Sequence, residues 1–289
     1  MSEGQHYYAK SEDVVIPVYN MPTKTGSIRS VSVRDLKGVT KTPINYVFNN
    51  KQYKINKIVP SVTTITSVMS KPALEAWKIN KAILTASEIP KNNMNDYVYI
   101  NLVKDKMYGE NKEILDFGTE IHASLESYFK EEDYIIPIKY KHFIQPAIDW
   151  LESNNIKKLF VEKGLYSDRG YAGLCDFIGT DGEYDYIIDF KTKNTKPDVD
   201  IYQSESYNMQ LAAYAYAYAE EYLHLDQIDL SMTTCLECEV GRKIKAFNLY
   251  ISSSEPGRLD VIEVKDLCKH MKVFDNCIDL WYYNKRVER

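Results

Sequence analysis

The sequence has few cysteines, no excess of positive charge and no long hydrophobic run. Five cysteines in 289 residues are too few, and odd in number, for a disulfide scaffold, so we expect reduced thiols. No apolar run approaches the ~18 residues of a membrane-spanning helix. The polar start MSEGQHYYAKSEDVV lacks the features of a secretory signal or a transit peptide. We therefore expect an intracellular protein that has no membrane partner.

The formal charge is −5, from 36 basic and 41 acidic residues. A protein with this balance has no global basic field, so binding to nucleic acid would have to come from local patches. The balance does not exclude DNA, because the carboxylates of a metal site themselves add negative charge. Hydrophobic residues at 44% and charged residues at 27% are typical of a soluble globular protein.

The N-terminal half of the sequence mixes short strands with helices. INYVFNNKQYKINKIV (44–59) alternates around NNKQ and predicts a hairpin. The segment 60–90 begins with a proline and Ser/Thr pattern and contains helix-forming stretches. Residues 98–130 are strongly helical, with an interruption near Gly109, and residues 140–154 predict another helix.

The C-terminal half has a different pattern. Between residues 159 and 193, three short apolar runs separated by the turns DRG and TDGE predict an antiparallel meander. A helix over 204–223, two strand-like runs around the turn EVGRK and a helix from about 263 follow. This order predicts a mixed α/β fold, with a central mixed sheet flanked by helices and N-terminal helical and β additions. The predicted domains are an extension over 1–58 that contains the hairpin and a main domain over 59–289, helical over about 60–155 and with the catalytic sheet and helices over about 156–289.

The segment YDYIIDFKTK (184–193) places a carboxylate and an ammonium in an otherwise apolar strand. Asp189 and Lys191 project together, because side chains two apart on a strand face the same way. Asp176 ends GLCD in the preceding run, and the short turn TDGE can bring it near Asp189. Two carboxylates beside a lysine suit a hard cation such as Mg²⁺ or Mn²⁺. The alternative is a solvated or ion-paired Asp-x-Lys, although burial among apolar residues favours a compensated carboxylate.

Further motifs surround this pair in a fixed order. FGTEIHASLE (117–126) lies upstream of GLCD and IIDFKT, and YNMQLAAYAYAYAE (207–220) lies downstream. The set resembles the G-x-x-x-H, G-x-x-D, D-x-K-T and Q-L-x-x-Y motifs of the PD-(D/E)xK nuclease superfamily, in its RecB-like exonuclease group. PSVTTI and KPALEAWKIN are similar to segments of phage and mitochondrial genome-maintenance exonucleases in that group. The resemblance covers about residues 60–220.

The resemblance implies a restriction-endonuclease-like core with Mg²⁺ or Mn²⁺ as cofactor. The implied metal ligands are His122, Asp176, Asp189 and the main-chain carbonyl of Phe190, and the implied catalytic residues are Asp176, Asp189 and Lys191. His122 lies at the edge of the apolar face of its helix. The alternative for His122 is therefore a partly buried histidine with a structural hydrogen bond.

Other residues are assigned supporting roles by the resemblance. Gln210 and Tyr214 are four apart on one helical face and would support the active site and the DNA backbone, unless they are ordinary helix surface and core positions. Glu162 opens the first strand of the meander and would add a carboxylate to the metal site, unless it lies on a solvated edge. Thr192, next to the lysine, would contact a phosphate.

The cysteines depart from one pattern of this group. Some RecB-like nucleases hold an iron–sulfur cluster on four cysteines, one upstream of the core and three downstream. No cysteine precedes Cys175 here, and Cys235 and Cys238 lie in a strand-like C-x-x-C, where positions three apart point to opposite faces. Cys268 and Cys277 follow in a helical context. We expect no iron–sulfur cluster, and zinc on the C-x-x-C is the alternative.

Contacts to DNA would come from local features. Trp77 lies among lysines, and positive grooves with stacking rings commonly hold single-stranded DNA. The alternative is a lysine-rich surface over core aromatic residues. Ser61, Thr63 and Thr64 could donate hydrogen bonds to a phosphate at a helix start. The segments that combine lysine with aromatic residues are 51–57, 71–81 and 91–106.

Together these features predict a Mg²⁺- or Mn²⁺-dependent deoxyribonuclease, first of all an exonuclease on single-stranded ends, in DNA replication, recombination or repair. Its partners would be DNA and replication or recombination proteins, and its location the cytoplasm, that of the infected host for a phage protein. One alternative is a structure-specific or duplex-end nuclease. Another is a non-catalytic DNA-binding protein on the same fold. A different metal-dependent phosphoesterase would need more ligands than five histidines supply.

Overall fold

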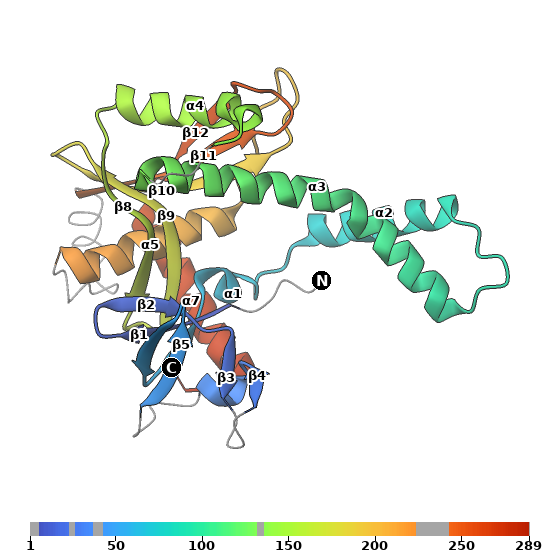
Figure 1. The fold of residues 1–289 in the computed structure, drawn as a ribbon, viewed down its shortest axis with the longest axis horizontal. Helices are drawn as coiled ribbons and strands as arrows, with labels where there is room; N and C mark the ends of the chain where they lie inside the picture. The colour runs from blue at the N-terminus through green and yellow to red at the C-terminus, as the bar shows by residue number, and fades with distance from the viewer. Residues whose placement is uncertain (1–5, 23–26, 37–42, 132–135, 224–242, 289) are drawn as a thin grey trace.

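A five-stranded mixed sheet forms the centre of the molecule (Figure 1). The computed structural model describes residues 6–22, 27–36, 43–131, 136–223 and 243–288. The strand order is β12-β11-β10-β9-β8, in which only β10 and β11 run parallel. The mixed α/β class is thus confirmed, and β8, β9 and β10 form the meander predicted from the sequence. The strands are β8 (Lys157–Ser167), β9 (Tyr171–Thr180), β10 (Asp185–Lys193), β11 (Ile244–Ser252) and β12 (Leu259–Glu263).

Helices cover both faces of this sheet. On one face, Ile187 and Ala246 belong to a core with α5 and α7. On the other, Ile188, Phe190 and Leu249 belong to a core with α3 and α4. Successive side chains of β10 therefore enter opposite cores, which explains its nearly continuous apolar run. The helices are α3 (Asp96–Lys130), α4 (Ile138–Ser153), α5 (Glu205–Tyr222) and α7 (Leu267–Lys285).

The N-terminal segment adds small sheets to the first core. The hairpin predicted over 44–59 is present as β5 and β6. The predicted division between residues 58 and 59 falls within β7, and N-terminal side chains such as Ile16 share the core of α5 and α7. The elements are β1 (Tyr7–Ser11), β2 (Val14–Pro17), β3 (Asn20–Pro22), β4 (Ile28–Ser30), η1 (Val33–Leu36), β5 (Ile44–Phe48), β6 (Lys51–Ile55), β7 (Ile58–Pro60) and α1 (Val62–Thr66).

An antiparallel helix pair projects away from the sheet (Figure 1). It consists of α2 (Pro72–Glu88) and residues 96–109 of α3, and we call it the arm. The Tyr99 hydroxyl donates to the carbonyl oxygens of Ala86 and Ile89, at 2.7 and 3.1 Å. Near the same end, Nζ of Lys106 lies 2.9 Å from the Glu88 carboxylate. These contacts join the end of α2 to the beginning of α3.

Two boundaries differ from the sequence prediction. The predicted interruption of the helix near Gly109 is wrong, because α3 runs unbroken from Asp96 to Lys130. A single glycine destabilises a helix by only ~1 kcal/mol relative to alanine, so it need not end one. The C-terminal helix begins at Leu267 instead of 263, because Glu263 still pairs with β11 as part of β12. Of the two strand-like runs around EVGRK, the first lies outside the described residues and the second is β11.

No helix among the described residues is long and apolar enough to cross a membrane.

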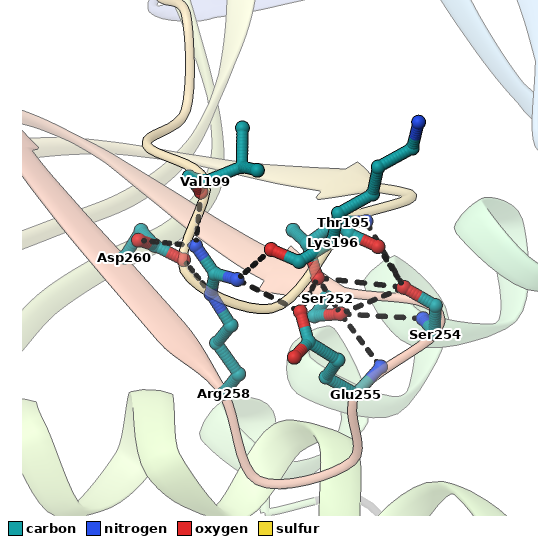
Figure 2. Close-up of polar contacts among 8 residues, drawn as sticks. All are labelled: Thr195, Lys196, Val199, Ser252, Ser254, Glu255, Arg258 and Asp260. Atoms are coloured by element: carbon teal, nitrogen blue, oxygen red, sulfur yellow. Dashed lines mark hydrogen bonds and ion pairs between the residues drawn. The ribbon is translucent and has the colours of Figure 1, made fainter.

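A polar network fastens the loop after β10 to the turn between β11 and β12 (Figure 2). The Arg258 guanidinium donates to the carbonyl oxygens of Lys196 and Val199, each at 2.8 Å. It also binds the Glu255 and Asp260 carboxylates, each at 2.8 Å. This loop leads from β10 into α5, so the network fixes the path between the two elements.

Candidate active site

The predicted catalytic residues meet where β9 and β10 separate. Cα pairing of these strands runs from Asp185–Thr180 to Ile188–Phe177 and ends there. Beyond this point the two strands are joined through a side chain instead of by backbone hydrogen bonds. Oδ2 of Asp176 accepts a hydrogen bond from the Phe190 N–H at 2.8 Å. The turn between the strands thus sets the register that brings Asp176 toward Asp189.

Asp189 and Lys191 form a buried ion pair on β10. Nζ of Lys191 lies 2.5 Å from Oδ2 of Asp189, and Asp189 is only 2% exposed. Apart from Lys191, no described residue donates a hydrogen bond to this oxygen. Burial by itself lowers the pKa of Lys191, but the Asp189 and Asp176 carboxylates outweigh it, so the pKa is raised. The lysine is therefore held as an ammonium at neutral pH.

Helix α5 holds the lysine from the other side. Oε1 of Gln210 accepts a hydrogen bond from Nζ of Lys191 at 3.3 Å, and Nε2 of Gln210 donates to the Tyr214 hydroxyl at 3.1 Å. Gln210 and Tyr214 are both buried, so they contact the site from within the fold and not from its surface. Nζ of Lys191 also lies 4.7 Å from the ring centroid of Tyr207. Sequence analysis missed Tyr207, although it precedes Gln210 by three residues and so shares its helical face.

His122 approaches the same carboxylates from α3. Its Nδ1 atom lies 3.5 Å from Oδ2 of Asp176. Burial lowers the pKa of His122, and the pull of Asp189 in the other direction does not reverse this. The imidazole is accordingly neutral at pH 7, the form that binds metal ions.

Acidic groups crowd the site. The pKa of Asp176 is raised well above its usual value, first by burial and then by Asp189. Glu162 on β8 lies opposite Asp176 in the strand register, between two paired positions. Burial and repulsion by Glu126 raise the pKa of Glu162 to about 7. Glu162 also adopts a left-handed backbone conformation (φ 49°), which is rare inside a strand.

Two buried polar side chains of β11 lie beside the ion pair of β10. In the parallel register Asn248 pairs with Asp189, and Tyr250 pairs with Lys191. Asn248 is fully buried and Tyr250 is 1% exposed. The Asn248 amide and the Tyr250 hydroxyl have no hydrogen-bond partner among the described residues. Sequence analysis missed both residues; the available signal was two polar groups at alternate positions of the apolar run IKAFNLYIS.

The remaining predicted residues lie in different places. The Thr192 side chain packs closely against Gly118 of α3. A Cβ atom added to this glycine would lie only 2.9 Å from Oγ1 of Thr192. Ser61 is buried and caps α1, its Oγ accepting from the Thr64 N–H at 3.0 Å, whereas Thr63 is exposed. Trp77 is 44% exposed on α2, in the arm. The Thr192 side chain thus lies on the α3 face of β10, opposite that of Lys191, and Trp77 lies on a separate element.

Three cysteines can be located. Cys175, Cys268 and Cys277 are buried free thiols, and burial raises the pKa of the Cys175 thiol. Cys235 and Cys238 lie outside the described residues.

A metal ion would need a change in these contacts. No three His, Cys, Asp or Glu side chains in the described ranges are arranged to hold one as they stand. Oδ2 of Asp189 is paired with the Lys191 ammonium, and Oδ2 of Asp176 accepts a hydrogen bond from the Phe190 N–H, so neither oxygen is free to bind a metal ion. The oxygen donors nevertheless suit a hard divalent cation, since carboxylate and carbonyl oxygens are the ligands that Mg²⁺ and Mn²⁺ prefer.

Comparison with known proteins gives only distant similarities. No protein-family model and no curated protein matches the chain. A crystal structure from Eubacterium rectale, described as a candidate exonuclease, is 13% identical over 71% of this chain and 68% of its own, with a TM-score of 0.35. The crystal structure of SSO0001 is 16% identical over 50% and 58% of the two chains, with a TM-score of 0.23. Function is therefore argued from the geometry of the site.

Proposed function

We propose that this chain is a RecB-like DNA nuclease with a restriction-endonuclease-like core, which hydrolyses phosphodiester bonds with Mg²⁺ or Mn²⁺. The observation that carries the proposal is the convergence of Asp176, Asp189 and Lys191 where β9 and β10 separate. An ordinary ion pair would need only one carboxylate. The second one, Asp176, is largely shielded from solvent, and burial and Asp189 raise its pKa, so its ionised form is costly unless a cation compensates it.

The metal ion would be held by side chains of α3, β9 and β10 once the present contacts of Asp176 and Asp189 change. The proposed ligands are His122, Asp176, Asp189 and the carbonyl oxygen of Phe190, with Glu162 as the next carboxylate. Oδ2 of Asp189 has Lys191 as its sole described partner, so it can accept a cation once the ammonium withdraws. When bound, the ion supplies Lewis-acid polarisation of the phosphodiester and lowers the pKa of water.

Lys191 would act on the reacting groups directly. Its raised pKa keeps it charged, so it can orient the attacking water and offset negative charge as the transition state forms. Gln210 accepts from its Nζ atom at 3.3 Å and limits how far the ammonium moves. Tyr214 in turn receives a hydrogen bond from Gln210, which makes both of them positioning residues for Lys191.

Single-stranded DNA ends are the substrate that we propose first. Tyr202 is 78% exposed just beyond β10, and Nζ of Lys193 donates to its carbonyl oxygen at 2.7 Å. An exposed ring beside lysines suits stacking of a base next to a phosphate, and Thr192 would contact the phosphate near Lys191. Structure-specific or duplex-end cleavage is the alternative reaction. The proposed partners are replication or recombination proteins.

Cleavage of three DNA forms tests this proposal. End-labelled single-stranded, duplex and circular DNA is incubated with Mg²⁺, Mn²⁺ or EDTA and analysed on gels. We expect metal-dependent loss of linear single strands, intact circles and no cleavage by Lys191→Ala. Lys245→Ala is the matched control, since Lys245 lies on β11 against the ring of Tyr184, 3.7 Å from its centroid, and faces away from Asp189 in the register of the sheet.

Each other outcome has a definite meaning. Cleaved circles would show endonuclease activity and contradict the preference for ends. DNA that is shifted but not cut by wild type and variant alike would favour the non-catalytic DNA-binding alternative. Cleavage that persists in Lys191→Ala would refute the assignment of the reaction to β10.

A further inference from the structure

One face of α2 is apolar and open to solvent. Its four large side chains Trp77, Ile79, Ile83 and Leu84 are 44%, 59%, 62% and 62% exposed. At 100° per residue, they lie on the half of the helix that also carries the exposed residues Ala73, Ala76, Asn80 and Ser87. These eight residues, which we call the α2 outer face, include no charged group.

Charged residues of α2 border this face or lie behind it, and the exposed Glu75 and Glu88 stand at its two edges. Lys78 and Lys81 are half-buried, and Lys78 pairs with Glu75 at 3.0 Å. Glu88 pairs with Lys106 of α3 at 2.9 Å. The centre of the face turned to water is thus uncharged, although charged and polar residues normally occupy that face of a surface helix.

The size of the face indicates a contact with another molecule. The four large side chains expose roughly 400 Å² of surface, taking about 150–250 Å² for a whole large side chain. Contiguous apolar patches of this size on a soluble protein mark interaction sites. Tyr97 and Val98 at the start of α3, 77% and 47% exposed, are further apolar side chains of the arm that are open to solvent.

DNA does not match this face. Nucleic-acid sites need cations for the phosphates, and the α2 outer face has none. Three of its four large side chains are aliphatic and cannot stack on bases as aromatic rings do. A protein surface of the same apolar character is the better match.

We propose that the α2 outer face binds the same face of a second copy of this chain, so that two arms pack as an antiparallel helical bundle. A two-fold contact sets each residue near the axis opposite its own copy. A charged residue there would meet a like charge, which is costly, and this face has no charge. Asn80 lies midway between Ala73 and Ser87, and its amide can both donate to and accept from an identical amide.

The spacing of small residues supports close approach of the two helices. Ala73, Ala76, Asn80, Ile83 and Ser87 follow the alternating three- and four-residue steps of a coiled-coil seam. Each partner of a standard interface contributes about 800 Å², and the four large side chains supply roughly half of it. The backbone and small side chains between them, together with the start of α3, can supply the rest. This inference does not depend on the proposed nuclease reaction.

Sedimentation velocity over a wide concentration range tests the proposal. We expect a wild-type dimer and, for Ile83→Lys, a dissociation constant higher by roughly tenfold or more, because each copy would bury a charge. Tyr283→Lys is the matched control, since Tyr283 is 80% exposed on α7 and should leave the dimer unchanged. Ile83 and Tyr283 are both exposed in the monomer, so circular dichroism spectra should match wild type. Melting curves should match at a concentration at which wild type is monomeric.

A cross-link gives an independent readout. Asn80→Cys should form a disulfide-linked dimer under mild oxidation, whereas wild type with its own cysteines should not. A wild-type monomer at every concentration, or an unchanged dimer in Ile83→Lys, would overturn the proposal. If Ile83→Lys instead weakens binding of single-stranded DNA by a monomeric protein, the α2 outer face belongs to a nucleic-acid site.

Discussion

The ring of Tyr214 on α5 lies directly against Gly173 on β9. A Cβ atom at residue 173 would lie 2.5 Å from Cε1 of Tyr214 and 3.0 Å from its hydroxyl oxygen. Tyr214 is buried, and its hydroxyl accepts the hydrogen bond from Gln210. The glycine of the GLCD motif is therefore required by the ring that closes over it, which links that motif to the Q-L-x-x-Y helix.

Gly173→Ala should lower both activity and stability. The new methyl group would push Tyr214 away and strain the Gln210 contact that positions Lys191. Overpacking of this kind costs about 1–3 kcal/mol, which urea unfolding can measure beside the nuclease assay. Gly109→Ala is the control, since no atom lies near the added Cβ and a helical glycine replaced by alanine gains about 0.5–1 kcal/mol. Unchanged activity in Gly173→Ala would separate Tyr214 from the positioning of Lys191.

Metal binding should separate the two members of the buried ion pair. In Lys191→Ala, the competitor for Oδ2 of Asp189 is gone, so we expect Mn²⁺ binding to persist while cleavage is lost. Asp189→Ala should lose both. Calorimetric titration of Mn²⁺ into each variant measures this, with Asp149→Ala on the exposed surface of α4 as a control. Loss of Mn²⁺ binding in Lys191→Ala would contradict the proposed division of roles.

The turn that sets the β9–β10 register should make stability depend on pH. Asp181 accepts hydrogen bonds from the Tyr184 and Glu183 N–H groups and from the Tyr186 hydroxyl, and these lower its pKa to about 2. A carboxyl with a depressed pKa stabilises the fold above its unfolded value of about 3.9, and loses this effect as pH falls through its folded value. Asp181→Ala should melt below wild type at pH 6, and the gap should narrow between about pH 4 and pH 2. An equal gap at every pH would mean that the ionised carboxylate is not responsible.

Local pattern was sufficient to predict the meander and its Asp-x-Lys pair. Alternation within β10 fixes that Asp189 and Lys191 share a face, and the structure has them 2.5 Å apart. Contacts between distant segments could not be derived from periodicity, because they depend on how helices pack. Ordered motifs indicated that His122 and Gln210 lie near the site, but not that Gln210 binds the lysine itself.

Other features were beyond the sequence for physical reasons. Glu162 adopts a left-handed backbone conformation. Glutamate is not a residue type that favours positive φ, so the local sequence gives no signal for this conformation. Asn248 looks like an isolated polar residue until β11 is paired in parallel with β10, a pairing that brings together segments more than fifty residues apart. The sequence places Trp77 among lysines, and periodicity alone does not show that Lys78 and Lys81 are half-buried; the DNA contact of Trp77 stays a prediction.

Asn248→Leu should raise the stability of the protein and lower its activity. The buried amide has no partner among the described residues, and such a group costs about 1–3 kcal/mol that a leucine of similar volume would not. Asn248 lies beside Asp189 in the register, so its loss should also disturb that carboxylate. We expect a raised melting temperature with reduced cleavage. A variant that melts lower would show that the amide is satisfied in solution, for example by buried water.

Arg258→Lys should loosen the loop that joins β10 to α5. The guanidinium donates to two carbonyl oxygens and two carboxylates at once (Figure 2). The ammonium group of lysine cannot reproduce this planar set of N–H donors. Solvent screens the contacts of the partly exposed Arg258, so we expect a small decrease of the urea midpoint in the variant. Limited proteolysis near residues 196–203 should accelerate in the variant.

The matched control for Arg258 is Arg29→Lys. Arg29 also holds a carboxylate in a two-pronged contact, with Asp35 at 2.6 and 2.7 Å, but at a distance along the chain from this loop. If both variants lose the same stability while only Arg258→Lys becomes sensitive to protease at 196–203 and slower in cleavage, the Arg258 network positions the loop for the reaction. If cleavage is unchanged despite faster proteolysis, the ordering of β10 and α5 does not depend on the segment between them, and the site is held by the sheet alone.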